Sequence, residues 1–288
     1  MASPLNKTLR IEHLPVSLDL PTLDVASTVN SERSGIFNGD VIDGLRRMGG
    51  WRFDLIIADP PYNLGKDFGN DSDKRTRTKF EGWTRNWIGA LTSVSSETAS
   101  LYICSDWKCS GLIESAMADA GWTILNRITW KREKGRGAAR NWKQNMEDIW
   151  FAVRDPKHYV FNIEAVKVEK KVIAPYRQDG KPKDWIQTPA GERIRKTHPS
   201  NIWTDLTVPF WSMPENTEHP TQKPERLIER IILASSNQGD RVLDLFSGSG
   251  TTSVVAHRLG RRFCGVDMNP DYVRLGLARL KREGYECE

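Results

Sequence analysis

The C-terminal end of the chain constrains its fold most strongly, because short apolar runs alternate there with amphipathic ones. Residues 241–245 and 262–266 are each predicted to form a strand, and residues 251–259 and 270–281 the helix that follows each strand. Strands that alternate with helices in this order pair in the same direction. The sequence therefore predicts an α/β protein built on a parallel sheet.

The same periods recur earlier in the chain. Residues 53–58 are apolar and bounded by turn-forming residues, which is typical of a buried strand. Pro224 can begin a helix, since its missing N–H costs nothing in the first turn. The apolar residues that follow it share one helical face: Leu227, Ile228, Ile231 and Ile232. Further strands are expected at 100–104, 123–130 and 148–153, and a further helix at 111–120.

Three segments show no sustained period. Residues 1–34 are rich in Ser, Thr and Pro and are expected to form a partly ordered arm. Residues 66–82 are polar, with a run of cations at 74–79, and are expected to form a basic loop. Residues 154–218 contain nine prolines and glycines, so an irregular, basic insertion is expected there.

Composition excludes several classes of protein. Of the 288 residues, 38% are hydrophobic and 27% charged, and no run approaches the roughly 18 apolar residues of a membrane helix. The first residues lack the apolar core of a signal peptide. No Cys-x-x-Cys pair occurs and the histidines are scattered, so neither a disulfide framework nor a metal site is predicted. We expect a cytoplasmic protein.

Positive charge is concentrated in the middle of the chain. The net charge is +5, yet residues 131–200 hold 17 Lys and Arg against 9 Asp and Glu. Several of the 11 tryptophans lie beside these cations, as Trp142 does between Arg140 and Lys143. Cations next to aromatic rings can contact phosphates and stack on bases, although an ordinary folded surface can also carry them. The pattern favours a polyanionic partner such as nucleic acid.

A glycine-rich turn separates the strand at 241–245 from the helix at 251–259. Gly248 and Gly250 allow a tight turn and a close approach to a ligand, and the helix N-terminus adds free N–H groups. Asp267 ends the next strand, 19 positions after Gly248, where a carboxylate can accept two ribose hydroxyls. Ser253 replaces the third glycine of the dinucleotide fingerprint, and Asp244 suits a cationic ligand better than a pyrophosphate. The segment predicts a nucleoside cofactor.

Asp59-Pro60-Pro61-Tyr62 follows the strand at 53–58, and so lies at the strand end where open α/β sheets bind ligands. The Asp59 carboxylate and the Pro60 carbonyl can both accept hydrogen bonds from an amino group, and Tyr62 can stack on a planar base. An exocyclic base amine is a poor nucleophile because its lone pair is delocalised into the ring. Two acceptors would favour its tetrahedral, nucleophilic geometry. The alternative is a proline turn capped by an Asp.

Together, the motifs resemble the S-adenosylmethionine-dependent amino-methyltransferases of DNA. Asp-Pro-Pro-Tyr precedes the glycine turn and the basic insertion lies between them, an order similar to the β group of that family. Within it, the chain resembles the solitary chromosomal and restriction-modification adenine-N6 enzymes. Asn38-Gly39-Asp40 resembles the segment that meets the cofactor adenine, and residues 219–224, His-Pro-Thr-Gln-Lys-Pro, the segment that opens the cofactor-side helix. The resemblance runs from Ile36 to Leu280.

The resemblance implies a Rossmann-like S-adenosylmethionine-dependent methyltransferase sheet with an inserted target-recognition region. It divides the chain into an N-terminal arm (1–35), a catalytic half (36–153), a target-recognition insertion (154–218) and a cofactor-binding half (219–288).

The resemblance also implies roles for individual residues. Catalysis is assigned to Asp59, Pro60, Pro61 and Tyr62. Binding of S-adenosyl-L-methionine is assigned to Asp40, Asp59, Lys223, Asp244, Phe246, Ser247, Gly248, Ser249, Gly250, Thr251, Thr252 and Asp267. DNA binding is assigned to Lys74, Arg75, Arg77, Lys79, Lys131, Arg132, Lys134, Arg136 and Arg140. No metal is implied.

The activity implied is transfer of a methyl group to the N6 amine of a flipped adenine in duplex DNA. Asp rather than Ser at the first motif position is a family tendency toward adenine, so cytosine-N4 methylation stays open. A catalytically silent DNA-binding regulator, a nicotinamide dehydrogenase, and RNA or protein as substrate stay open as well. The implied partners are double-stranded DNA, a second copy of the chain and a cognate restriction endonuclease, with the protein at the nucleoid.

Overall fold

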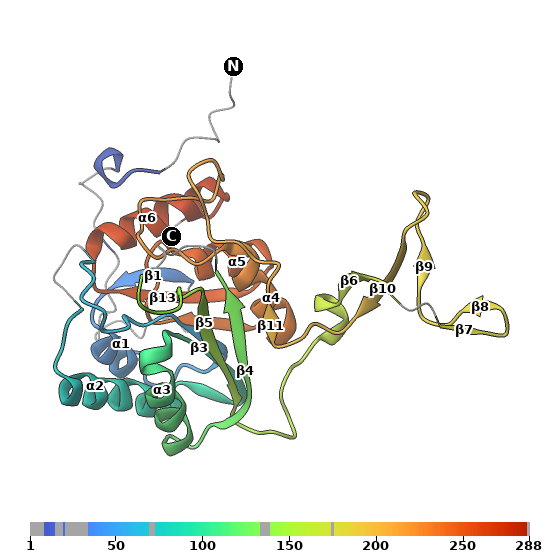
Figure 1. The fold of residues 1–288 in the computed structure, drawn as a ribbon. Helices are drawn as coiled ribbons and strands as arrows, with labels where there is room; N and C mark the ends of the chain where they lie inside the picture. The colour runs from blue at the N-terminus through green and yellow to red at the C-terminus, as the bar shows by residue number, and fades with distance from the viewer. Residues whose placement is uncertain are drawn as a thin grey trace.

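A mixed sheet of eight strands runs through the computed structural model, which describes residues 9–14, 20, 34–68, 73–132, 139–173 and 176–286 (Figure 1). The strand order is β1-β13-β12-β2-β3-β5-β4-β11. The five strands from β1 to β3 are parallel, β5 is antiparallel to both of its neighbours, and β11 is parallel to β4. In that order the strands are Gly35–Asn38, Arg262–Asp267, Arg241–Asp244, Phe53–Ala58, Ser95–Ser105, Met146–Val153, Thr123–Lys131 and Ile202–Trp203. The predicted α/β class with a parallel sheet is confirmed.

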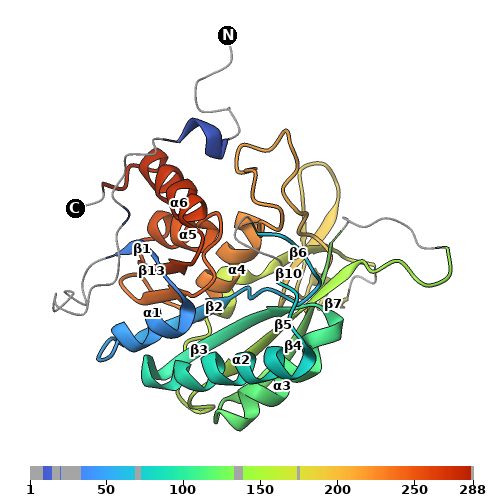
Figure 2. The same cartoon turned by 90° about the vertical axis from the view of Figure 1, so that its left-hand side faces the viewer.

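Helices cover both faces of this sheet (Figure 2). One face carries α1 (Val41–Arg47), α2 (Arg77–Ala90) and α3 (Trp107–Asp119), and the other carries α4 (Glu225–Ser235), α5 (Thr251–Arg258) and α6 (Pro270–Arg282). Alternate residues of a strand point to opposite faces. On β2, Ile56 therefore packs with the first set of helices, while Leu55 and Ile57 pack with the second.

Most elements expected from periodicity are present, and outside residues 154–218 two helices and a strand were missed. The helix after Pro224 buries the apolar face that the sequence predicted. The predicted loop at 66–82 is wrong in its second half, because α2 begins at Arg77. Thr76 caps that helix through its hydroxyl, and Phe80, Thr84, Trp87 and Ile88 place a buried stripe among polar neighbours. The unexpected β1 and α1 are each too short to reveal a period.

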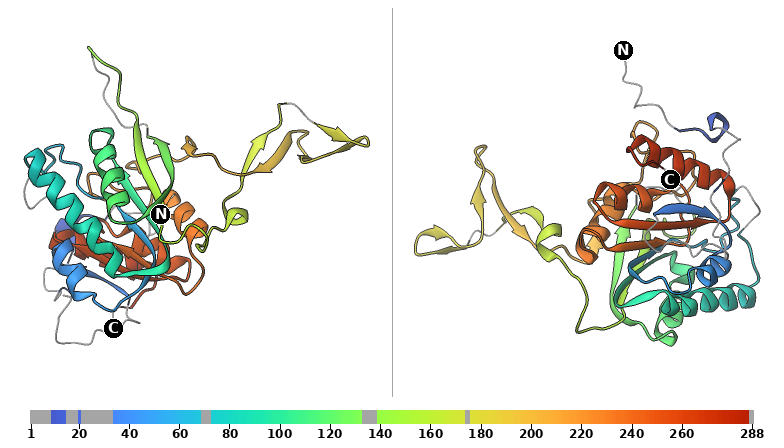
Figure 3. Two further views of the ribbon diagram at one scale, coloured as in Figure 1. Left: turned by 90° about the horizontal axis from the view of Figure 1, so that it is seen from below. Right: turned by 180° about the vertical axis from the view of Figure 1, so that it is seen from behind.

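The insertion at 154–218 contains short sheets rather than wholly irregular chain. A single helical turn (Ile163–Val166) packs against α4, and the chain then extends away from the body (Figure 3). There β6 (Val168–Lys171), β10 (Arg193–Thr197) and β9 (Ile186–Gln187) form one sheet, and β7 (Arg177–Gln178) pairs with β8 (Lys181–Pro182). Strands of two to five residues are too short to show a period. The chain returns to the main sheet through β11, beside β4.

Three of the cysteines, Cys104, Cys109 and Cys264, are buried and unpaired. Burial raises the pKa of each thiol, which keeps it neutral. The fourth, Cys287, and nearly all of the expected N-terminal arm lie outside the described residues. Along the described chain, no helix has the length and apolar character needed to cross a membrane.

Gly250 holds α5 against α6, which yields a test of the packing. Its φ is 73°, and an added Cβ would lie 2.7 Å from Cα of Gly276. Gly250→Ala is expected to lower the free energy of unfolding by about 2–4 kcal/mol, because backbone atoms must move apart. Gly111→Ala is the control, since its Cβ would meet nothing on the exposed side of α3; a gain of roughly 0.5–1 kcal/mol is expected. Urea unfolding measures both, and equal effects would contradict this account.

Candidate active site

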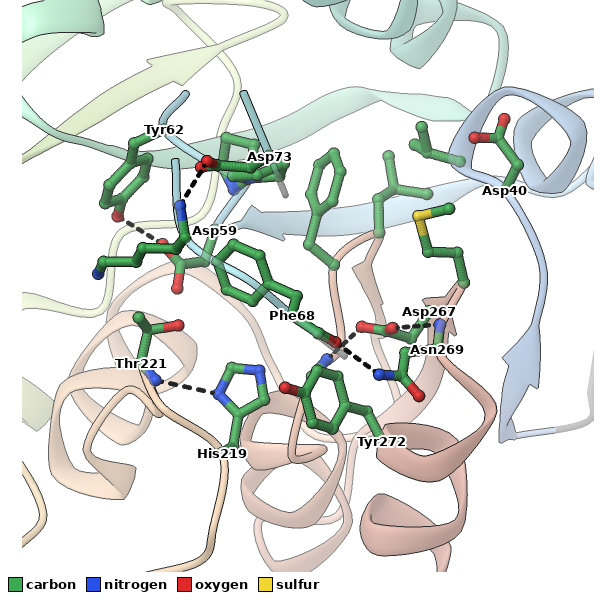
Figure 4. Close-up of a pocket in the computed structure, with 18 of the residues that line it drawn as sticks. Asp40, Asp59, Tyr62, Phe68, Asp73, His219, Thr221, Asp267, Asn269 and Tyr272 are labelled. Atoms are coloured by element: carbon green, nitrogen blue, oxygen red, sulfur yellow. Dashed lines mark hydrogen bonds between the residues drawn. The ribbon is translucent and has the colours of Figure 1, made fainter. Parts of the chain in front are cut away.

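A pocket of about 490 Å³ lies at the carboxyl edge of the parallel strands (Figure 4). Its walls come from the segments that follow β1, β2, β12 and β13. Parallel strands end at the same edge of a sheet, so segments far apart in the sequence meet there. The pocket thus brings together Asp40, Asp59, Phe246 and Asp267, each predicted to belong to a functional site.

Asp267 forms one end of the pocket and is fixed by backbone donors. Its Oδ2 accepts a hydrogen bond from the N–H of Gly248 at 2.7 Å, and its Oδ1 accepts one from the N–H of Asn269 at 2.9 Å. Each carboxylate oxygen keeps a further lone pair for a ligand. Burial raises the pKa of Asp267 above its ordinary value. Asp40, across the pocket, caps α1 by accepting from the N–H of Ile42 at 2.8 Å.

Asp59 forms the other end, and both of its oxygens are engaged. The Tyr62 hydroxyl donates to Oδ1 at 2.5 Å, and the Lys223 ammonium donates to Oδ2 at 2.5 Å. Burial would lower the pKa of Lys223, but the carboxylates of Asp59 and Glu147 outweigh burial and raise it, so the lysine stays protonated. Burial and the charge of Asp59 raise the pKa of Tyr62, which stays a neutral donor.

Glu147 is a second carboxylate at this end, and no sequence motif had indicated it. It lies near the start of β5, is 2% exposed, and its Oε2 is 3.3 Å from Nζ of Lys223. Its Oε1 forms an ion pair with Arg132. The one available signal was the pair of acidic residues, Glu147 and Asp148, at the start of the otherwise apolar β5. Arg132, predicted to bind DNA, lies in this ion pair, and Lys223, predicted to bind the cofactor, lies outside the pocket lining and contacts Asp59 instead.

The segment after Tyr62 forms one wall of the pocket and is tied in place at two points. Asp73 accepts hydrogen bonds from the N–H groups of Leu64 and Lys66, at 3.1 and 2.8 Å. The amide of Asn269 donates to the carbonyl of Phe68 at 2.6 Å. Figure 4 shows the Phe68 ring between Asp59 and Asp267. The segment therefore bridges the two ends of the pocket.

His219 was regarded only as part of a motif, yet it lines the pocket. Its ring lies 4.4 Å from that of Tyr272, and its Nδ1 accepts a hydrogen bond from the N–H of Thr221 at 3.4 Å. Burial lowers the pKa of His219 to about 4, so the ring is neutral at physiological pH. His219 therefore lines the pocket as a neutral polar group rather than as a charged one.

Several residues predicted to bind the cofactor lie behind the glycine turn rather than on the pocket lining. Arg279 donates to the Ser249 carbonyl at 2.9 Å and to the Thr251 hydroxyl at 3.0 Å. Asp244 accepts from the N–H of Phe246 and is hydrogen-bonded to Thr252, while burial raises its pKa to about 7. Ser247 and Gly250 are likewise buried and outside the lining. These side chains shape the turn that presents Phe246 and Gly248.

Comparison with known proteins identifies the kind of site. The sequence model of the N6/N4 DNA methylases matches residues 53–278, which include both motifs. The chain belongs to the N6/N4 DNA methylase family. The DNA adenine methyltransferase YhdJ of Escherichia coli K12 is 36% identical to this methylase over 87% of this chain and 83% of its own. The type II methyltransferase M.HpaI of Haemophilus parainfluenzae is 34% identical over 85% of this chain and 73% of its own.

Solved structures share the fold of this methylase. The complex of M1.HpyAVI with S-adenosylmethionine aligns with a TM-score of 0.61 at 24% identity, over 85% of this chain and 98% of that one. The cytosine-N4-specific PvuII DNA methyltransferase aligns with a TM-score of 0.58 at 15% identity, over 86% of each chain. The predicted methyltransferase fold is thereby confirmed.

S-adenosylmethionine is the cofactor of the family, and the hydrogen-bond acceptors of this pocket fit it. The volume lies within the roughly 300–1,000 Å³ of small-molecule sites. Asp267 offers free lone pairs to ribose hydroxyls, and Asp40 can accept from an amino group. Phe246 and Met268 supply apolar surface for a purine ring. Nowhere in the described residues do three or more metal-ligating side chains cluster to hold an ion.

The cations predicted to bind DNA occupy different positions. Lys74 and Arg75 line the pocket mouth, and the Arg75 guanidinium lies 4.4 Å from the centre of the Trp83 ring. Arg77 pairs with Glu81 on the surface of α2, and Lys79 is exposed one turn into that helix. Lys131, at the end of β4, and Arg140 are exposed. Lys134 and Arg136 lie outside the described residues.

Gly248 provides a test of the cofactor side. Its φ is 49°, and an added Cβ would lie 2.8 Å from Nε2 of His219. Gly248→Ala is expected to weaken S-adenosylmethionine binding about tenfold or more, because the turn must move where it lines the pocket. Gly239→Ala is the matched control, since its φ is 84° but nothing lies within 4 Å of the new Cβ. Isothermal titration calorimetry that gave both variants the same affinity would contradict this role.

Proposed function

We propose that this methylase transfers a methyl group to the N6 amine of an adenine flipped out of duplex DNA. The observation that carries the proposal is the Asp59 carboxylate, held at the carboxyl end of β2 beside the Pro60 carbonyl. The relative named as a DNA adenine methyltransferase, at 36% identity, supports adenine as the target. In the family, Asp rather than Ser at this motif position also favours adenine.

Asp59 and Pro60 would orient the target amine. An amine has two N–H groups, and these two oxygens can each accept one, which draws the nitrogen lone pair out of conjugation with the ring. Oδ1 of Asp59 accepts from the Tyr62 hydroxyl and keeps a further lone pair, so the incoming amine can share this oxygen or replace that bond. The Tyr62 ring would then stack on the base. S-adenosylmethionine, when bound, supplies an electrophilic methyl group on a positively charged sulfur.

Cytosine-N4 methylation is the second candidate. The PvuII enzyme, which is cytosine-N4-specific by name, shares this fold over 86% of the chain. An N4 amine presents the same two N–H groups to Asp59 and Pro60. The two candidates therefore differ in the base that the pocket admits rather than in the chemistry of the amine.

Duplex DNA is the proposed substrate, with the insertion at 154–218 as the region that reads its sequence. This region extends from the body and is basic. Within it, the guanidinium groups of Arg177 and Arg193 lie 5.8 and 5.6 Å from the centre of the Trp185 ring. The four-part division of the chain stays a proposal. A homodimer stays a prediction, which light scattering would test. A cognate restriction endonuclease and a location at the nucleoid stay predictions as well.

The Asp59 role is tested with labelled S-adenosylmethionine and unmethylated genomic DNA, followed by digestion and identification of the labelled nucleoside. Wild type is expected to label N6-methyladenine. Asp59→Ala is expected to lose on the order of 10³-fold in rate while still binding the cofactor. Asp119→Ala, which removes an exposed carboxylate of α3, is the control. Comparable rates for Asp59→Ala and wild type would refute the mechanism, and label in N4-methylcytosine would refute the base assignment.

The exposed Arg140 tests the DNA-binding surface. Arg140→Glu is expected to weaken DNA binding and to reduce the slope of log affinity against log salt by about one, because a phosphate contact releases a counterion. Lys281→Glu makes the same change of charge at the exposed end of α6, away from the pocket. Fluorescence anisotropy across a salt series measures both slopes. An unchanged slope for Arg140→Glu would remove this segment from the interface.

A further inference from the structure

A buried row of alternating charges runs from the catalytic motif into the sheet. It consists of Asp59, Lys223, Glu147 and Arg132, in that order. The two inner members are almost inaccessible, with Lys223 at 8% and Glu147 at 2% exposure. One ammonium is therefore shared by two carboxylates. Nothing in the transfer chemistry itself requires Glu147, so its burial calls for another explanation.

Lys223 is held rigidly by its own segment of chain. It directly precedes Pro224, the cap of α4. Gln222 beside it donates to the Glu215 carbonyl at 2.7 Å and accepts from the Thr217 hydroxyl at 2.7 Å. Burying a charge is costly unless it is paired, so Lys223 requires its carboxylate partners. Glu147 thus gives the ammonium a second carboxylate partner, through an ion pair without a hydrogen bond.

The two oxygens of Asp59 are not equivalent in this arrangement. Oδ2 is bound to the buried ammonium of Lys223, a strong charge-assisted contact. Oδ1 is bound to Tyr62, which is half-buried and on the pocket lining. The Tyr62 bond is the one that a ligand in the pocket can replace. The ammonium therefore leaves Oδ1 as the acceptor that faces the substrate.

We propose that Lys223 and Glu147 are positioning residues, which hold a positive charge against Oδ2 of Asp59 and turn its Oδ1 toward the target amine. Lys223 supplies the positive charge, and Glu147 holds that charge in place. The inference rests on the proposed role of Asp59 as the acceptor of the amine, and it applies equally to adenine and cytosine.

The cluster also determines how the site responds to pH. The ionisable groups that face it are Asp59, Tyr62 and Lys66 after β2, Cys104 on β3, Arg132 after β4, Glu147 on β5, Asp244 on β12, and His219 and Lys223 before α4. Without the ammonium, Asp59 and Glu147 would be neighbouring carboxylates with one counterion fewer. One of the two would then take up a proton, as like charges in a shared site do.

The test is the pH profile of methyl transfer in Lys223→Met. The acid limb is expected to move to higher pH by about one unit or more, since the acceptor must be ionised. Adding Glu147→Gln to that variant removes the second carboxylate, and the limb is expected to move back toward wild type. Lys281→Met, which removes an exposed lysine, should leave the profile unchanged. Loss of stability alone would lower the rate without moving the limb. An acid limb of Lys223→Met at the wild-type position would overturn the proposal.

A second measurement does not depend on activity. Near pH 7, Lys223→Met is expected to show an infrared C=O band of a protonated carboxyl in addition to any band from Asp244, whose pKa burial raises to about 7, and the difference spectrum against wild type isolates it. Its absence from a folded Lys223→Met would overturn the inference. If Lys223→Met does not fold, the single variant Glu147→Gln is measured instead. A wild-type rate and a wild-type pH profile for this variant would overturn the inference. A several-fold loss of kcat with unchanged cofactor affinity would support it. If Lys223→Met shows the band but wild type transfers no methyl group, the result contradicts the proposed function and not this inference.

Discussion

The parallel pairing of β12 with β2 is the constraint on which the rest of the structure depends. It inserts the C-terminal strands of the chain between β1 and β2, so that the four strands whose following segments form the pocket end at one edge. The register places Asp244 opposite Ile57, and the two motifs therefore leave the sheet side by side. Both halves of the chain supply strands to this one sheet, and neither half could form the pocket alone.

Charge in this site is balanced locally rather than through solvent. Asp267 is held by backbone N–H groups at one end of the pocket, whereas Asp59 is held by a lysine that a second carboxylate fixes. The two carboxylates thus sit in different environments suited to different tasks. One keeps free lone pairs that face the pocket, and the other contacts a buried ammonium. His219 stays neutral between them because burial opposes its protonation.

Much of this could be predicted from local pattern. The strand at 53–58, the face of α4 and the glycine turn all stand out because period and turn chemistry are properties of neighbouring residues. The start of α2 was missed because its buried stripe lies among charged residues, and the strands of the insertion were missed because they are too short for a period. Glu147 was missed for a different reason, since its partners lie on other elements.

The sequence by itself determined the α/β class, the two motifs and the family, because each depends on residue types at short, regular spacings. Only the tertiary structure decided what Lys223 and Arg132 do. The sequence predicted that Lys223 binds the cofactor and that Arg132 binds DNA, and in the structure both pair with the buried Glu147. Residues that are 76 positions apart, such as Glu147 and Lys223, interact only because the sheet closes between them. The partners of a buried charge determine what it does, and these partners come together only when the chain folds. No local sequence pattern identifies them.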